Sequence, residues 1–261
     1  MHDDFHSDDE LEFLEQLEEA WSEASLTTLD EELPDNLILY PIDDAVIFPG
    51  MLVPVDVPAV GDARTVVDQV LDGGRVLGFV TIKDERQDDD HSEQAIPDQL
   101  YRMGVIARVV RVLRLPDDAL RLLCQTGRRF HLERFRRADT LLVAKVNYPP
   151  EVGPRDEVQG KELEVLRQRL MHEVQELVRM RPDLPKEAAE FVSHLEGAGP
   201  LADFAAANFL QKKDERQRLL ETTELRNRVE LALIYLGRER EMAELGERLH
   251  REIHEKIEAS Q

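Results

Sequence analysis

Ten arginines lie close together between residues 102 and 137 of a chain whose formal net charge is −22. They are Arg102, Arg108, Arg111, Arg114, Arg121, Arg128, Arg129, Arg134, Arg136 and Arg137, with three acidic residues among them. Guanidinium groups hold phosphates and carboxylates through paired hydrogen bonds. The stretch is therefore either a basic patch for a nucleic acid, with Arg108, Arg111, Arg114, Arg121, Arg128 and Arg129 as the candidate contacts, or it is neutralised by the chain's own acidic segments. We expect neutralisation, because Phe130 and Phe135 are the only aromatic residues of the stretch that could stack on bases.

Two histidines and one cysteine are the other residues that could do chemistry. His250 and His254 are one helical turn apart, but Arg251 follows the first where a zinc protease needs Glu, and no third ligand is apparent. We expect surface histidines and no metal. Cys124 lies in an apolar run without a neighbouring His, which indicates a buried structural thiol.

Known catalytic and nucleotide-binding motifs are not recognisable. No Gly-x-Ser-x-Gly elbow occurs, which disfavours an independent hydrolase. The only Gly-Lys pair is Gly160-Lys161, and Glu162 follows it where a phosphate-binding loop requires Ser or Thr, so we interpret the pair as a helix start. We therefore expect no catalytic residues and no cofactor.

The composition narrows the class of protein further. Apolar residues make up 42% of the 261 residues, enough for a real core in one or two domains. The strong negative charge disfavours unspecific binding to nucleic acids or anionic membranes. A single cysteine allows no internal disulfide, and no apolar run approaches the roughly 20 residues that cross a bilayer. We expect a cytoplasmic protein.

Short apolar runs punctuated by Gly, Pro or Asp predict strands over residues 37–150. The runs cover residues 37–42, 46–55, 76–82, 105–115, 119–125, 129–135 and 141–148, and a single helical window covers residues 61–71. Such a pattern favours one compact, largely antiparallel β domain. Prolines such as Pro41 and Pro54 place their strands at sheet edges or make them short. Residues 84–99 predict a polar loop, residues 116–118 a hairpin turn, and Gly127 a second bend.

The apolar period changes to that of helices after residue 157. Repeats of three or four residues predict a helical bundle over residues 157–222, with helices over residues 157–181, 186–195, 201–209 and 214–221. Residues 223–261 predict one long helix of about 35 residues, or roughly 50 Å at 1.5 Å per residue. Its last twenty residues outreach the bundle, so we expect their apolar stripe to bind more protein.

The first 36 residues form an acidic leader without Lys or Arg. Leu11, Leu14, Leu17 and Trp21 recur at helical spacing and predict a short amphipathic helix over residues 9–24. Either the leader is a solvating tail, or its Phe13, Leu17 and Trp21 side chains dock on a partner or on the chain's own basic strands.

At the level of motifs the chain resembles the LON substrate-binding domain, which is found at the N-terminus of the ATP-dependent Lon protease. The resemblance begins with Leu39-Tyr40-Pro41-Ile42 and with Val46-Ile47-Phe48-Pro49-Gly50-Met51-Leu52-Val53-Pro54. It continues through residues 100–109, 113–117, 127–130, 200–206, 212–220 and 224–230, and so covers most of residues 34–261.

The resemblance implies an α+β fold: a mostly antiparallel, PUA-like β pseudo-barrel, then a helical bundle, then a long helix that in the family leads to an ATPase module and a serine–lysine protease. Family members are usually hexamers, and this region is held to recognise unfolded or damaged proteins. Because the Walker A loop and the protease half are missing, the chain is either an N-terminal piece of a longer Lon or a stand-alone protein. The helix that ends uncapped at Gln261 favours a piece, or a close relative, over an independent enzyme.

Two functional hypotheses follow. In the first, the chain is a substrate-recognition and oligomer-supporting module whose partners are unfolded proteins, further copies of its helical region, and the ATPase and protease modules. Candidate client contacts are Phe48, Met51, Leu52, Met171 and Met180, because flexible apolar side chains suit varied clients, although core packing is the alternative for each of them. In the second, the chain is a stand-alone scaffold or a nucleic-acid adaptor that uses the arginine-rich strands and the helical tail.

Overall fold

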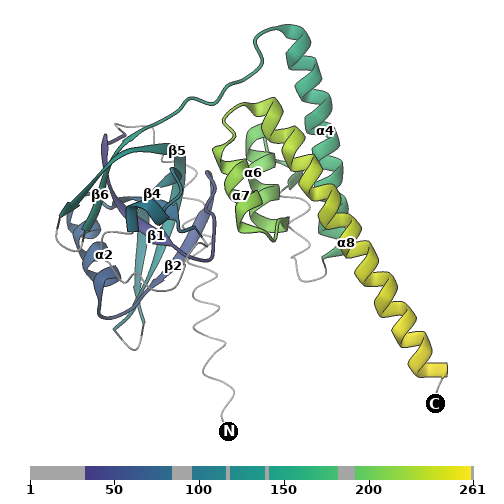
Figure 1. Ribbon diagram of the computed structural model, residues 1–261, viewed down its shortest axis with the longest axis horizontal. Helices are drawn as coiled ribbons and strands as arrows, with labels where there is room; N and C mark the ends of the chain where they lie inside the picture. Colours follow the sequence, from purple (N-terminus) through teal and green to yellow (C-terminus); the bar gives the residue numbers. More distant parts are fainter. Residues whose placement is uncertain (1–32, 84–95, 116–117, 139–140, 182–191, 260–261) are drawn as a thin grey trace. The chain divides into compact units, whose positions relative to one another are not determined.

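The computed structural model describes residues 33–83, 96–115, 118–138, 141–181 and 192–259 (Figure 1). The chain divides into two compact units, Met1–Tyr148 and Pro149–Gln261. We call them the β unit and the helical unit. The helix predicted for the acidic leader lies outside the described residues, and so does most of the helix predicted over residues 186–195.

The β unit is built on one sheet of six strands, and all pairs in it are antiparallel except β1 with β3. The strands are β1 (Asn36–Ile42), β2 (Leu52–Val57), β3 (Val76–Thr81), β4 (Met103–Arg114), β5 (Leu120–Ala138) and β6 (Leu141–Asn147), and the helices are α2 (Asp62–Asp72) and α3 (Ile96–Gln99). The predicted α+β class with a mostly antiparallel sheet is confirmed.

Strand β5 closes the sheet into a ring. The strand order is β2-β5-β4-β3-β1-β6, and β5 pairs with β6 as well. The first part of β5 lies between β2 and β4, whereas residues 131–138 pair with β6. Five strands therefore form a closed barrel, and β2 extends it along one half of β5, as the predicted pseudo-barrel requires.

The predicted break at Gly127 is wrong, because Gly127 lies inside the continuous strand β5. The pairing of β5 with β4 slips there between Val105 and Ala107. A bulge takes up extra residues while the strand continues, so a glycine and two arginines that look like a bend do not end the strand.

The predicted strand over residues 46–55 begins only at Leu52. Pro49 and Gly50 form a turn before it, with a φ of 74° at Gly50, a value that glycine adopts at no steric cost. Residues 96–99, predicted as loop, form the short helix α3.

Pro41 and Pro54 lie at positions where their strands have a neighbouring strand of the described sheet on one side only, so the missing backbone N–H breaks fewer hydrogen bonds. Pro54 lies in β2, at the end of the strand order, as predicted. Strand β1 is flanked on both sides, but it pairs with β6 through residues 36–38 and with β3 through residues 39–42. Pro41 therefore falls where β1 meets β3 alone among the described pairings.

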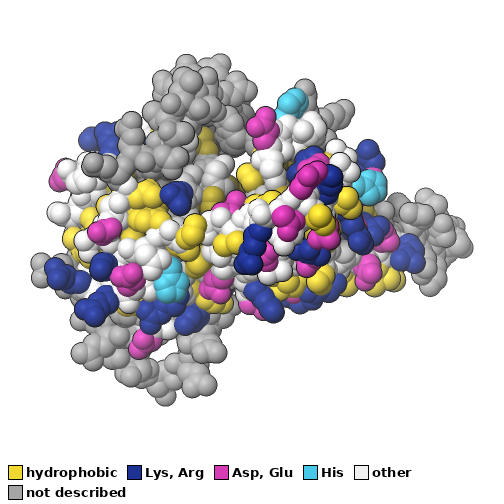
Figure 2. All heavy atoms as spheres, turned by 90° about the horizontal axis from the view of Figure 1, so that it is seen from above, with side chains coloured by type: hydrophobic (Ala, Val, Ile, Leu, Met, Phe, Trp, Pro, Cys, Tyr) yellow, Lys and Arg dark blue, Asp and Glu magenta, His cyan; other side chains and the backbone are white. Residues whose placement is uncertain are grey.

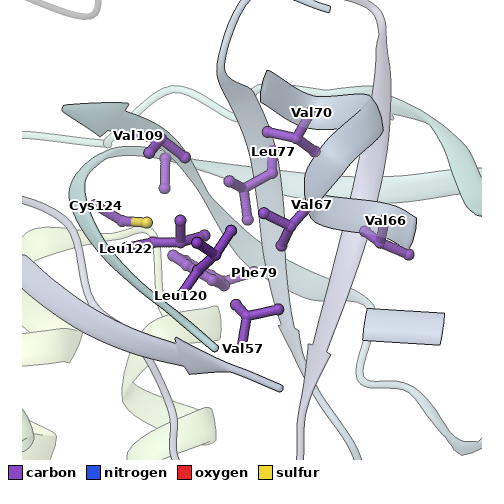
Figure 3. Close-up of a cluster of buried hydrophobic side chains, with 11 residues drawn as sticks. Val57, Val66, Val67, Val70, Leu77, Phe79, Val109, Leu120, Leu122 and Cys124 are labelled. Carbon is purple, nitrogen blue, oxygen red and sulfur yellow. The ribbon is translucent and has the colours of Figure 1, made fainter. Parts of the chain in front are cut away.

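Helix α2 packs its apolar face on the sheet. Val66, Val67 and Val70 of α2 meet Leu77 and Phe79 of β3 in a buried cluster that also includes Val57, Ala107, Val109, Leu120, Leu122 and Cys124 (Figure 3). We call this the α2 cluster. A second buried cluster takes alternate residues of the ring strands, namely Leu37, Leu39, Val80, Ile106, Phe130, Leu132, Ala144 and Val146, together with Leu100.

The helical unit is a small bundle around one long helix. Its helices are α4 (Glu157–Met180), α6 (Ala198–Phe209), α7 (Lys213–Glu221) and α8 (Leu225–Ala259). Asp156 caps α4 by accepting a hydrogen bond from the Gln159 backbone N–H at 2.9 Å, and Gly160-Lys161 lies in the first turns of this helix, as expected. Helix α6 begins three residues earlier than predicted, after Gly197 with a φ of 91°.

A buried arginine holds the start of α8 to the segment before α4. Arg228 is fully buried and donates hydrogen bonds to the Thr222 carbonyl oxygen and to Glu151 Oε2, both at 2.7 Å. Its Nη1 also lies 3.7 Å from Oδ1 of Asp203, a buried carboxylate of α6. An isolated buried charge is costly, so Arg228 depends on these contacts. Through them it connects the start of α8 to α6 and to the segment before α4.

Candidate functional site

Three neighbouring strands, β2, β5 and β4, carry one side-chain face that mixes arginine with apolar residues. Its three cross-strand rows are Leu52–Gln125–Arg108, Pro54–Leu123–Arg111 and Asp56–Arg121–Leu113. We call these nine residues the arginine face. Their neighbours along each strand, such as Val57, Cys124 and Val109, belong to the α2 cluster, and side chains alternate along strands, so the arginine face points to the opposite side of the sheet.

The arginine face is partly open to solvent. Pro54 and Asp56 are exposed, and Leu52, Leu113 and the three arginines are half-buried. Leu123, in the middle of the nine, is only 3% exposed. The surface therefore offers apolar contacts between charged groups, instead of a purely charged patch.

One of its arginines is neutralised by the neighbouring strand. Arg121 donates hydrogen bonds from Nε and Nη2 to the two carboxylate oxygens of Asp56, at 2.6 and 2.8 Å. These bonds lower the pKa of the Asp56 carboxyl and raise the pKa of the Arg121 guanidinium. For this arginine the expected internal neutralisation is found, and the carboxylate that provides it belongs to the neighbouring strand β2.

Arg108 lies at the other end of the face. Its Nε is buried, and no described group accepts a hydrogen bond from it. Buried donors are paired in most structures, so this Nε is an exception among the described groups.

Strand β2 is positioned by a hydroxyl clamp. The buried Thr126 of β5 donates from Oγ1 to the Phe48 carbonyl oxygen at 2.7 Å, and the same oxygen accepts from the Met51 N–H at 2.7 Å. The backbone N–H of Thr126 donates to the Met51 carbonyl oxygen at 2.8 Å. The turn at Pro49–Gly50 is thereby fixed to β5, and the register of Leu52 follows from it.

The proposed client contacts of the Pro-Gly turn differ in access. Phe48 is fully buried, so it supports the turn from inside the β unit and is not offered to a client at the surface. Met51 is half-buried beside the turn, and Leu52 belongs to the arginine face. Of the three, Leu52 is the residue that the fold brings together with predicted arginines.

The two methionines of α4 that were predicted as client contacts do not share a surface. Met171 and Met180 are both half-buried on α4, nine residues apart. At 3.6 residues per turn this spacing places them on opposite flanks of the buried stripe formed by Leu170, Val174, Leu177 and Val178. They cannot act as one apolar contact.

The register also divides the predicted basic patch. Arg108, Arg111 and Arg121 lie on the arginine face. Arg114 instead pairs with Leu120 of the α2 cluster, so it belongs to the opposite side of the sheet. Arg128 is exposed at the bulge of β5, and Arg129 beside it is buried. Six arginines that are close in sequence therefore do not form one continuous patch.

The remaining candidates for chemistry are placed as follows. Cys124 is buried in the α2 cluster, as predicted, and burial raises the pKa of its thiol to about 12. The side chains of His250 and His254 lie outside the described residues. In the described part of the chain, no three His, Cys, Asp or Glu side chains converge as metal ligands would.

A second surface lies on α8. Ile234, Met242, Leu245 and Leu249 recur at helical spacing and are between 46% and 67% exposed, on a different side of the helix from the buried Val229, Ala232 and Leu236. We call these four residues the α8 stripe. The expected open apolar surface is confirmed for its described part, where α8 extends past α4 (Figure 1). Figure 2 shows apolar and charged side chains alternating over the surface of these helices.

Sequence reasoning missed five residues of the arginine face, namely Pro54, Asp56, Leu113, Leu123 and Gln125. Each lies an even number of residues from a predicted contact or pairs with one across the strands. Strand alternation could have placed Asp56 with Leu52, but Gln125 and Leu113 required the register of β4 on β5. That register slips between Val109 and Arg111, and a slip cannot be read from one sequence.

No helix among the described residues is both long enough and apolar enough to cross a bilayer.

Comparison with solved structures shows the same fold. The N-terminal domain of the Mycobacterium avium complex Lon protease matches with a TM-score of 0.61 and 20% identity, over 77% of this chain and 98% of that one. The Lon N-terminal domain protein from Xanthomonas campestris matches with a TM-score of 0.53, also at 20% identity and over 77% of this chain.

Comparison with curated sequences gives relatives that are much longer. The Lon protease of Leptospira interrogans is 32% identical over 253 residues, which are 96% of this chain and 29% of that protein. The Lon protease of Anaeromyxobacter dehalogenans is 32% identical over 84% of this chain and 25% of its own length. This chain spans less than a third of the relatives that it matches.

The family model described as "ATP-dependent protease La (LON) substrate-binding domain" matches residues 36–238, from the first residue of β1 into α8. The match includes every strand of the β unit and the complete arginine face. The chain therefore belongs to the LON substrate-binding domain family.

Proposed function

We propose that this chain is the substrate-recognition part of a Lon-type, ATP-dependent protease and that it binds unfolded protein segments on the arginine face. The observation that supports this most directly is the mixed character of that face, on an edge of the sheet, within the family-matched region. Half-buried leucines contact apolar side chains of a client, and the guanidinium groups donate hydrogen bonds to its carboxylates.

The edge position of β2 also allows its backbone to contribute to client binding. An extended segment can pair with an open strand edge through main-chain hydrogen bonds, which do not depend on the client's sequence. Pro54 supplies no N–H in the middle of β2, so such pairing is interrupted. Weak and reversible binding suits a module that must pass its clients on.

The test measures binding of an unfolded protein to the full chain. Reduced and carboxymethylated α-lactalbumin, labelled with fluorescein, is titrated with the chain and followed by fluorescence anisotropy. Leu52→Asp combined with Leu113→Asp should weaken binding about tenfold or more, because it places charge where apolar contact is expected. Val60→Asp is the matched control, since Val60 is 79% exposed in the β unit but outside the face.

Equal affinity of the double variant and the wild type would refute the assignment of clients to this face. Loss of affinity in both the double variant and the Val60 control would indicate a general charge effect and would refute it too.

The chain itself carries no catalysis, since it matches a substrate-binding domain and the catalytic steps would belong to ATPase and protease modules. The chain acts in the cytoplasm, a location that its single cysteine supports. It associates with further copies through the α8 stripe, where exposed apolar side chains are available.

A further inference from the structure

Strand β2 has a neighbour on one side only among the described strands, and its register shows which of its backbone groups face away from that neighbour. Just before β2, the Thr126 N–H donates to the Met51 carbonyl oxygen at 2.8 Å, and the Gly50 N–H donates to the Thr126 carbonyl oxygen at 3.2 Å. Both backbone groups of Thr126 therefore point toward the β2 side. Successive residues of a strand alternate in this respect, so residues 124, 122 and 120 of β5 also point toward β2.

The same alternation leaves the backbone groups of Leu52, Pro54 and Asp56 pointing away from β5. It holds at the other end of β5 as well, where the Leu115 N–H on the β4 side donates to the Ala119 carbonyl oxygen at 2.9 Å. Proline has no N–H, so the outer edge of β2 offers the two N–H donors of Leu52 and Asp56 and three carbonyl oxygens. The missing donor of Pro54 breaks no hydrogen bond to β5.

The side chains of β2 give this edge two different faces. Val53, Val55 and Val57 pair across the strands with residues 124, 122 and 120, all of which belong to the α2 cluster. Val57 is buried, whereas Val53 and Val55 are half-buried. We call these three residues the valine row. The opposite face is the arginine face, where β2 contributes a leucine, a proline and an aspartate. A strand added at the edge thus meets apolar neighbours at every second position on the valine side only.

We infer that an unfolded client binds as one extended strand, antiparallel to β2, with every second side chain apolar and packed against the valine row. This inference rests on the proposed function and names the class of segment that is bound. The client residues opposite Leu52, Pro54 and Asp56 donate to the three carbonyl oxygens and accept from the two N–H groups. The intervening client residues carry the apolar side chains, and their N–H groups point away from β2. Parallel pairing would be slightly less stable per residue.

The edge fits a client strand better than the β2 strand of a second copy. Two β2 strands paired with each other bring two Pro54 residues to the shared edge, and each of them leaves one carbonyl oxygen without a donor. A client segment without proline leaves only one. Because one hydrogen bond changes an affinity about fivefold, the second missing bond disfavours pairing between copies.

Backbone methylation of a peptide separates strand pairing from side-chain contact. A short peptide of alternating threonine and valine, labelled with fluorescein, is titrated with the full chain and followed by fluorescence anisotropy. Methylating the backbone nitrogen of every threonine should weaken binding at least about tenfold, because it removes the donors to β2. Methylating every valine nitrogen is the matched control. It should change the affinity less than about twofold, since those N–H groups point away from β2.

Variants of β2 test the same hydrogen bonds from the other side. Asp56→Pro removes an outward N–H and should weaken peptide binding about fivefold. Asp56→Thr is its matched control, because it loses the same carboxylate and the same bonds to Arg121 but keeps the N–H. Pro54→Val adds an outward N–H and should strengthen binding by about the same factor. A gain in affinity is a result that a misfolded variant could not give.

Equal loss of affinity for both methylated peptides overturns the strand pairing. Loss for the valine-methylated peptide alone overturns it too, because the apolar side chains would then lie on the arginine face. The same holds if Pro54→Val leaves the affinity unchanged, or if carboxymethylated α-lactalbumin binds and the peptide does not. In each of these cases binding of α-lactalbumin that depends on Leu52 and Leu113 leaves the proposed function intact. Absence of α-lactalbumin binding contradicts the proposed function itself.

Discussion

Gly78 and Gly104 leave room for the ring of Phe130 inside the β unit. A Cβ on Gly104 would lie 2.2 Å from the Phe79 carbonyl oxygen and 2.6 Å from Cζ of Phe130. Both distances are far below van der Waals contact, and the first neighbour is backbone that cannot turn away. The absence of a side chain at Gly104 is therefore a packing requirement of β3, β4 and β5.

Gly104→Ala should destabilise the β unit by about 3 kcal/mol, because it overpacks a closed core. Hydrogen exchange followed by mass spectrometry measures this loss separately for each unit. Gly160→Ala is the control: nothing lies within 4 Å of its added Cβ on α4, so it should stabilise the helix by about 0.5–1 kcal/mol. Unchanged protection of β4 and β5 in Gly104→Ala would contradict the packing argument.

Cys124 gives the β unit a dependence on alkaline pH. Burial raises the pKa of its thiol from the ordinary 9.0 to about 12. The unfolded chain therefore loses this proton at a lower pH than the folded chain, and rising pH favours the unfolded state. Stability is fully retained below pH 9 and declines between pH 9 and about pH 12.

The free energy of unfolding of the β unit should fall above pH 9 by up to about 1.4 kcal/mol per pH unit. Cys124→Ala should remove this slope between pH 9 and 10, where urea midpoints are compared. Burial also raises the pKa of Tyr148, to about 12, so part of the decline above pH 10 should remain in the variant. Identical slopes between pH 9 and 10 in both proteins would exclude the buried thiol as the cause.

At the scale of elements, the segment before α4 is attached to α8 by backbone and side chain together. The Val152 N–H donates to the Thr223 carbonyl oxygen at 3.0 Å, and the Leu225 N–H donates to that of Val152 at 3.0 Å. Arg228 adds its bonds to Glu151 and lies near the buried Asp203. Three segments distant in sequence thus meet at one guanidinium.

Arg228→Met should destabilise the helical unit by about 3–5 kcal/mol, because it removes a fully buried cation that lies near the buried carboxylate of Asp203 and is bonded to Glu151 and Thr222. Arg226→Met is the control two residues away. Arg226 is exposed and pairs with Glu162 and Glu230, so its loss should cost at most about 1 kcal/mol. Urea unfolding followed at 222 nm compares the two, and equal midpoints would contradict the role assigned to Arg228.

Much of the element content could be predicted from the sequence, because apolar periodicity reports which face of a segment is buried. Helix α2, strands β1 and β3, and the long helix α8 were predicted within a few residues. Gly127 and residues 46–48 were assigned wrongly, since turn residues look alike whether they end a strand, form a bulge or precede a strand. The arginine face could be predicted only in part, because its rows depend on register and on the bulges between β4 and β5.

At the scale of the whole molecule, the α8 stripe is the surface that we expect to join copies of the chain. Leu245→Ser with Leu249→Ser should shift sedimentation velocity profiles toward monomer at every concentration, since both leucines are exposed and their loss costs no core packing. Val158→Ser with Val165→Ser on α4 is the control, because these residues are equally apolar and more exposed. An oligomer that survives the α8 changes would place the interface elsewhere.

The pairing of β1 with both an early and a late strand sets the order in which the β unit can be completed. During synthesis β1 can join β3 once residue 81 has left the ribosome, but residues 36–38 must wait for β6, which ends at Asn147. Until then a nascent chain exposes an open edge and the apolar residues of an unclosed barrel. A protein of the LON substrate-binding family thus resembles, during its own translation, the unfolded polypeptides that we propose it binds.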